Sequence, residues 1–159
     1  MPKETERKFL VMNDTWRTNA NPVPCRQAFL LVSRECCVRV RVMGKEACLT
    51  VKGSRHGCTR AEYEYVIPRE DAEEMMQTMA RGHVIEKTRW YVEWENMTWE
   101  VDEFHGLNAG LVVAEIEFED EDMEISLPPW AGREVTSDHH YDNGYLAEHP
   151  YGEWGKGDG

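Results

Sequence analysis

Alternation of apolar and charged side chains with a period of two runs through most of the first 120 residues, and it limits the possible folds more than any other feature. Segments such as 38–42 and 60–67 show it clearly. Successive side chains of a β-strand point to opposite faces, so this pattern is typical of strands with two unlike faces. Eight strands are predicted, over residues 4–11, 25–32, 38–42, 47–52, 60–67, 84–94, 97–104 and 111–118.

The strands are interrupted by one segment with helical features. Pro68 precedes residues 69–79, and the segment ends before Gly82, which predicts a helix between them. Shorter helices are predicted at 14–18 and near 137–147. Residues 148–159 carry Gly, Pro and charge without periodicity, so we expect a disordered tail after a single domain of residues 1–147.

The polar face of these strands is almost wholly ionic, and its charges are sorted by sign. Arg39 and Arg41 are both cationic, whereas Glu62 and Glu64 are both anionic. Like charges two residues apart on one strand face lie roughly 6.5–7 Å apart, and they repel unless opposite charge faces them. Two interpretations stay open on this ground alone. The charged faces are either solvated outer surfaces or the inner wall of a closed barrel.

A closed barrel with this parity inward would have a nearly neutral interior. Its cations would be Lys8, Arg39, Arg41, Lys52, Arg60, Lys87 and Arg89, and its anions Glu4, Glu6, Glu62, Glu64, Glu100, Asp102, Glu115, Glu117 and Glu119. A barrel of eight strands can hold one small ligand. Divalent metal would shift the balance toward binding a polyanion. The carboxylates of Glu4, Glu6, Glu115 and Glu117 offer oxygen ligands that suit Mg²⁺ or Mn²⁺ better than zinc.

Composition narrows the partners and the compartment. The chain has 18 Lys and Arg against 30 Asp and Glu, a formal net charge of −12, which argues against nonspecific binding to nucleic acid or an anionic membrane. Its longest apolar run, residues 28–32, is far shorter than the roughly 20 residues of a membrane span, and no signal peptide is recognisable. The five cysteines and six histidines show no zinc-site spacing. We therefore expect a cytoplasmic protein with reduced thiols.

The charged motifs, taken in order, resemble those of the CYTH superfamily, the triphosphate tunnel metalloenzymes. Residues 4–8 are similar to the family's E-x-E-x-K strand, 26–30 to R-Q-G-Y-L, 38–41 to R-x-R and 49–53 to T-x-K. Residues 60–64 resemble R-x-E-x-E, 86–90 E-K-x-R-Y, 100–104 E-x-D-x-F, 114–118 the final E-x-E strand, and 129–136 a segment of the small bacterial triphosphatases. The resemblance covers about residues 3–147. It departs from the pattern at His140, where bacterial members usually carry Arg or Lys.

The resemblance implies an α+β fold, an eight-stranded antiparallel β-barrel or tunnel with a few flanking helices. Such a tunnel binds a small-molecule triphosphate with Mg²⁺ or Mn²⁺. The expected activity is metal-dependent hydrolysis of inorganic tripolyphosphate to pyrophosphate and phosphate, by a monomer or homodimer. The alternatives are an organic triphosphatase acting on thiamine triphosphate or a nucleotide, a class IV-like adenylate cyclase, and a polyphosphate-binding module without catalysis. The complete carboxylate set disfavours the binding module.

Site roles also follow from the resemblance. The substrate-binding cations are expected to be Lys8, Arg39, Arg41, Lys52, Lys87 and Arg89, and the metal ligands Glu4, Glu6, Glu115 and Glu117. Catalytic roles are expected for Glu62, Glu64, Asp102 and Lys52. The tryptophans Trp16, Trp90, Trp94, Trp99 and Trp130 are expected to pack outside the barrel. No aromatic or amide cluster that could recognise a base is expected inside it.

Overall fold

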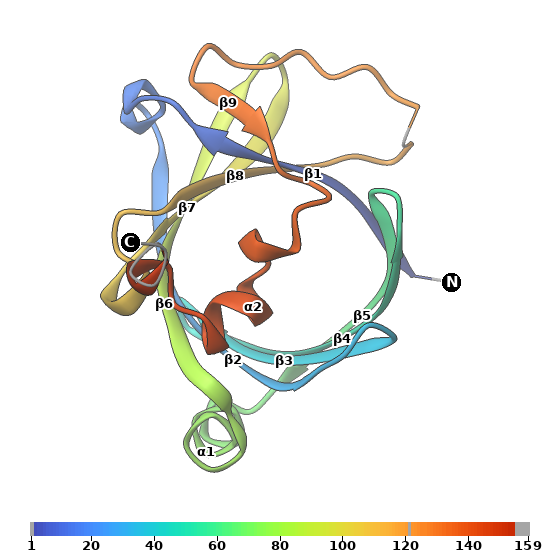
Figure 1. Cartoon of the computed structure of the whole chain (residues 1–159), viewed down its shortest axis with the longest axis vertical. Helices are drawn as coiled ribbons and strands as arrows, with labels where there is room; N and C mark the ends of the chain where they lie inside the picture. Colours follow the sequence, from blue (N-terminus) through green and yellow to red (C-terminus); the bar gives the residue numbers. More distant parts are fainter. Residues whose placement is uncertain (1, 121, 155–159) are drawn as a thin grey trace.

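Eight antiparallel strands close into a barrel in this computed structural model, which describes residues 2–120 and 122–154. The strands are β1 (Lys3–Val11), β2 (Asn21–Val32), β3 (Cys36–Met43), β4 (Glu46–His56), β5 (Thr59–Ile67), β6 (Arg81–Trp94), β7 (Met97–Phe104) and β8 (Val112–Glu117). Around the ring they follow the order β5-β4-β3-β2-β6-β7-β8-β1, and β1 pairs with β5 to close it (Figure 1). The predicted fold class is confirmed.

A ninth strand and the helices lie around this ring. The short strand β9 (Ala131–Glu134) pairs with β1. The helix α1 (Arg69–Met79) spans the residues predicted to be helical and lies outside the barrel (Figure 1). Single 3₁₀ turns occur at η1 (Thr15–Arg17) and η2 (Gly106–Asn108). The helix predicted near 137–147 forms two pieces, the 3₁₀ turn η3 (His139–Tyr141) and α2 (Asn143–Glu148), because Asp142 between them is extended.

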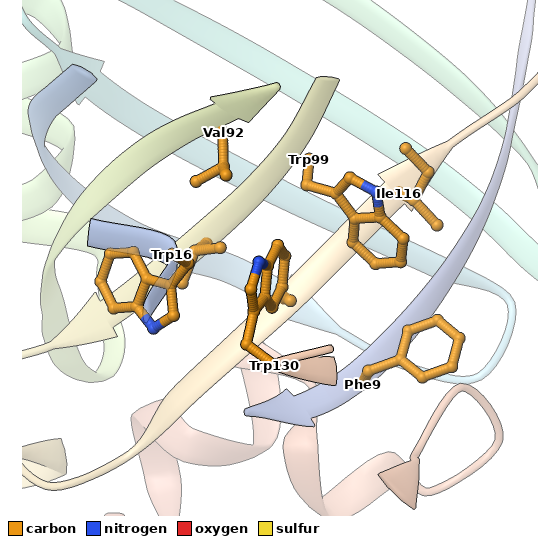
Figure 2. Close-up of a cluster of buried hydrophobic side chains, with 8 residues drawn as sticks. Phe9, Trp16, Val92, Trp99, Ile116 and Trp130 are labelled. Carbon is orange, nitrogen blue, oxygen red and sulfur yellow. The ribbon is translucent and has the colours of Figure 1, made fainter. Parts of the chain in front are cut away.

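The apolar parity of most strands faces outward, where it is covered. Phe9, Trp99 and Ile116 form one buried cluster beneath Trp16 and Trp130, so the tryptophans pack outside the barrel as predicted (Figure 2). The rings of Trp99 and Trp130 meet edge to face with centroids 5.5 Å apart, a favoured aromatic geometry. A second cluster joins α1 to the outer faces of β2, β3 and β4.

The side chains that face the barrel interior change from charged to apolar at one end of the barrel, and α2 packs against this end. Leu146 and Ala147 contact Phe29 of β2 and Ile85 of β6, which are fully or nearly fully buried. In Figure 1, α2 and the segment before it project inside the ring of strands. Gly82 permits the close approach, because its φ is +70° and a Cβ there would lie 2.3 Å from the carbonyl oxygen of Ala147. The C-terminal segment thus covers this end of the interior.

The disordered tail predicted over 148–159 is wrong for residues 148–154. Glu148 ends α2, and the 3₁₀ turn η4 (Tyr151–Glu153) follows. The Tyr151 backbone N–H donates to Asn108 Oδ1 at 2.8 Å, and the Trp154 ring contacts the Tyr151 ring at 5.0 Å between centroids. Residues 155–159 lie outside the described residues. No helix in the described part of the chain has both the length and the apolar character that crossing a membrane requires.

Candidate functional site

A cavity of about 1020 Å³ fills the interior of the barrel, and its wall carries both signs of charge. The inward parity inferred for the charged faces is therefore correct for the predicted site. All of the expected site residues except Asp102 line this cavity. They are Glu4, Glu6, Lys8, Arg39, Arg41, Lys52, Glu62, Glu64, Lys87, Arg89, Glu115 and Glu117.

Arg39 is a buried cation of this wall with a hydrogen bond to a side chain. It is 8% exposed, its Nη2 donates to Thr50 Oγ1 at 3.3 Å, and Glu64 lies 3.9 Å away. Its Nε is buried without a hydrogen-bond partner among the described residues. Burial, with the nearby Arg41 and Arg89, lowers the pKa of Arg39 to about 10. A buried guanidinium with an unused donor favours an anionic ligand that would accept from it.

Two lysines on the wall are held by carboxylates. Lys52 Nζ lies 2.7 Å from Glu4 Oε1 and 3.2 Å from Glu62 Oε2, so it bridges β1 and β5. Lys8 Nζ lies 4.0 Å from Glu115 Oε1 and 3.4 Å from Asp142 Oδ1. These partners compensate part of the positive charge of two lysines that line the cavity.

Asp102 is the predicted site residue that does not line the cavity. It is 1% exposed and lies behind the wall, where Lys87 Nζ donates to Oδ2 at 2.8 Å and Arg89 Nε donates to Oδ1 at 2.8 Å. Although burial alone would raise it, the pKa of Asp102 is held well below its usual range by Arg89 and Lys87. Its expected catalytic role does not fit this position, because its oxygens are occupied in orienting two cations.

The four predicted metal carboxylates lie on the neighbouring strands β1 and β8. Glu6 is paired in register with Glu117, and Lys8 with Glu115. Burial, together with Glu115 and Glu4, raises the pKa of Glu6 to about 8, and burial also raises the pKa values of Glu4 and Glu117. Burial opposes ionisation of Glu115 too, but Lys8, Arg89 and Lys87 together outweigh it and the pKa falls to about 2. Crowded, partly buried oxygen donors of this kind fit a hard divalent cation.

Without metal, the carboxylates around Glu6 should make the fold less stable as pH rises. Glu6 keeps its proton in the folded state up to about pH 8, whereas in the unfolded chain it ionises near its ordinary pKa of 4.5. The folded state therefore binds the extra proton, and the free energy of unfolding falls as pH increases between these two values. We expect the melting temperature in excess chelator to fall over this range and Glu6→Gln to flatten the fall. A Glu6→Gln profile as steep as the wild-type profile would contradict this assignment.

Several residues of the wall were not predicted. Arg55 points to the cavity, and its Nη2 lies 3.6 Å from Glu6 Oε1, although its parity is opposite to that of Lys52. An irregularity in the β4–β5 pairing between Lys52 and Arg55 shifts the register and explains this. Asn143 of α2 also reaches the wall, because the C-terminal segment enters the barrel end.

Aromatic rings from the C-terminal segment correct two further expectations. His139, Tyr145 and His149 line the cavity at this end, so the wall is not free of aromatic groups. Tyr145 already stacks on His149, with centroids 4.2 Å apart. The ligand atoms of Asp138, His139 and His140 lie within 4.8 Å of one another, a proximity that sequence spacing did not indicate. His140 Nδ1 hydrogen-bonds Asp138 at 2.7 Å, and both histidines are exposed.

Comparisons with known proteins agree with this geometry. The CYTH domain family model matches residues 2–150. An inorganic triphosphatase of Acetivibrio thermocellus is 46% identical over 151 residues, which are 95% of this chain and 97% of that protein. One from Nitrosomonas europaea is 36% identical over 148 residues, 91% and 96% of the two chains. A crystal structure of the inorganic triphosphatase NE1496 is similar with a TM-score of 0.64 and 34% identity, covering 92% of this chain and 95% of that one.

Proposed function

The chain belongs to the CYTH domain family, and we propose that it is an inorganic triphosphatase that hydrolyses tripolyphosphate to pyrophosphate and phosphate inside the barrel. The observation that carries the proposal is the buried Arg39, whose Nε lacks a partner among the described residues and which lines a cavity together with eight other lysines and arginines. Such a cavity suits a compact polyanion. The two relatives of this chain that are inorganic triphosphatases support the same substrate.

The cations of the cavity wall would bind the substrate. Arg39, Arg41 and Arg89 offer planar guanidinium groups for bidentate contact with phosphate oxygens, and Lys8, Lys52 and Lys87 offer point charges. Phosphoryl transfer needs little covalent chemistry from the protein, so holding the phosphates in line and neutralising their charge is most of the work. Asp102 contributes as a positioning residue, because it fixes Lys87 and Arg89 from behind.

Glu4, Glu6, Glu115 and Glu117 would hold the divalent metal, Mg²⁺ or Mn²⁺. A bound ion would supply Lewis-acid neutralisation of the phosphate oxygens. The chain's own contribution is to gather these carboxylates on β1 and β8 and to keep Glu115 ionised beside Lys8. The raised pKa of Glu6 means that metal must compete with a proton for this ligand near neutral pH.

Glu62 and Glu64 on β5 are the proposed acceptors that orient the attacking water. Both line the cavity, and both are already near cations, Glu62 at 3.2 Å from Lys52 Nζ and Glu64 at 3.9 Å from Arg39 Nη2. Burial opposes ionisation of Glu62, but Lys52, the hydrogen bond with Glu4 and Arg39 together lower its pKa. Glu62 is therefore ionised at neutral pH. Lys52, which it shares with Glu4, would place positive charge beside the reacting phosphate.

We expect tripolyphosphate to be cleaved with a kcat/KM at least about tenfold higher than that for ATP or thiamine triphosphate, a difference of about 1.4 kcal/mol. The reason is that Tyr145 and His149 stack on each other, so one face of each ring is already covered where a base would have to stack. The measurement is steady-state hydrolysis of the three substrates with Mg²⁺ and with Mn²⁺. Comparable values for ATP would instead assign the rings lining the cavity to base recognition and make this an organic triphosphatase.

A further inference from the structure

Gln27 is a buried neutral residue among the charges of the barrel interior. It lies on β2, paired in register with Arg41 of β3, and is fully buried. Its Oε1 accepts from Arg41 Nε at 3.0 Å, and its Nε2 donates to Asn143 Oδ1 at 2.6 Å. Among the described residues, the Arg41 guanidinium donates its side-chain hydrogen bond to Gln27 Oε1.

The orientation of both amides is determined by cations at the two ends of this chain of hydrogen bonds. Arg41 Nε can only donate, so Gln27 must turn its oxygen toward it and its NH₂ group toward Asn143. Lys87 Nζ, also only a donor, contacts Asn143 Oδ1 at 2.9 Å. Asn143 must therefore present its oxygen to both Lys87 and Gln27. Lys87, Asn143, Gln27 and Arg41 are therefore linked by three consecutive hydrogen bonds. Both amides in this series have only one possible orientation.

This series of hydrogen bonds links α2 to two cations of the cavity wall, Lys87 and Arg41. Asn143 is the first residue of α2, and that helix packs into the barrel end through Leu146 and Ala147. Gln27 contacts Arg41 through Nε alone, which leaves the two terminal nitrogens of the guanidinium for a ligand. A carboxylate at position 27 would instead neutralise Arg41. A neutral acceptor aims the guanidinium while keeping its charge for phosphate.

We infer that Gln27 is a positioning residue of the triphosphate site, which aims Arg41 and is itself held by Asn143. The inference rests on the proposed function of the cavity. Its consequence is that the C-terminal segment does more than cover one end of the barrel, because Asn143 accepts from the Gln27 amide and so helps to hold the oxygen that Arg41 contacts.

The test is a double-mutant cycle between Gln27 and Arg41. Gln27→Met is similar in volume and has no acceptor oxygen, so Arg41 loses its anchor. We expect the KM for tripolyphosphate to rise about tenfold with kcat within about threefold of wild type, because ground-state and transition-state contacts of Arg41 weaken together. In an Arg41→Ala background, Gln27→Met should change KM little further.

Controls separate this role from a general effect on folding. Asn108→Leu removes another buried amide, one that caps Tyr151 away from the cavity, and should lower the melting temperature without changing KM. If Gln27→Met does not fold, Asn143→Ala in the same cycle with Arg41→Ala replaces it, with an expected rise in KM of about threefold. Effects of Gln27→Met and Arg41→Ala that multiply independently would overturn the inference.

The outcome for the wild-type protein separates the two proposals. If it hydrolyses tripolyphosphate and Gln27→Met has wild-type KM, the positioning role fails and the proposed function stands. If the wild-type protein neither hydrolyses tripolyphosphate nor gains melting temperature from it, the proposed function is wrong and this inference falls with it.

Discussion

Replacing Glu115 by Gln should reduce tripolyphosphate hydrolysis by at least about 10²- to 10³-fold while the barrel remains folded, a loss typical of removing one essential electrostatic group from an active site. Glu115 is the proposed metal ligand whose pKa falls to about 2, because Lys8, Arg89 and Lys87 together outweigh the effect of burial. It is therefore ionised at neutral pH. The amide keeps the side-chain volume but removes the charge that a divalent cation needs.

The measurements are turnover as a function of metal concentration and the melting temperature in chelator. Glu103→Gln is the matched control, because Glu103 lies on β7, pairs with Arg17 and does not line the cavity. We expect Glu103→Gln to retain wild-type turnover. Full activity of Glu115→Gln, or of the wild type in excess chelator, would remove metal from the proposed reaction.

Substitution of Arg39 by Met should abolish the stabilisation of the protein by tripolyphosphate and lower kcat/KM by at least about 10²-fold. Arg39 is buried, its Nε has no partner among the described residues, and its pKa is lowered by burial, Arg41 and Arg89. Ligand binding to the folded state raises stability by mass action, so losing a central cation reduces the shift in melting temperature. In the ligand-free protein, an apolar side chain of similar length removes a desolvated charge and should be neutral or stabilising.

This opposition between ligand-free stability and activity distinguishes a binding residue from a structural one. Arg26→Met is the control, since Arg26 forms an ion pair with Glu73 of α1 and does not line the cavity. It should leave the tripolyphosphate-induced shift unchanged. An Arg39→Met protein that is destabilised but still binds and turns over tripolyphosphate normally would assign Arg39 a structural role.

The parity of the strands was predictable because burial and charge repeat with the period of the backbone. Arg39 and Arg41 share one face with Thr50 of β4 and Glu64 of β5, and this follows from alternation alone once the barrel is closed. Glu64 lies 3.9 Å from Arg39 and supplies opposite charge on this face. The closure of the sheet into a barrel was predicted from the family resemblance, since alternation fits an open sheet equally well.

What alternation could not reveal are departures from the period and contacts with the C-terminal segment. Arg55 enters the cavity through an irregularity in register that leaves no mark in the residue types. Arg41 contacts Gln27, a residue without charge, and alternation does not identify that partner. Asp102 shares the inward parity, but two donors from β6 hold it behind the wall. The strand β9 is only four residues long and shows no alternation.

The outward position of the two clusters around Trp99 and α1 divides this protein into a part that maintains the fold and a part that meets the ligand. In a protein whose core lies inside, enlarging or reshaping a binding site removes packing atoms and leaves destabilising voids. Here a charge on the cavity wall can be exchanged without opening a void among the outer apolar side chains. Such an architecture should tolerate wide variation of substrate among its descendants, since mutations that explore new ligands need not first be offset by mutations that restore folding.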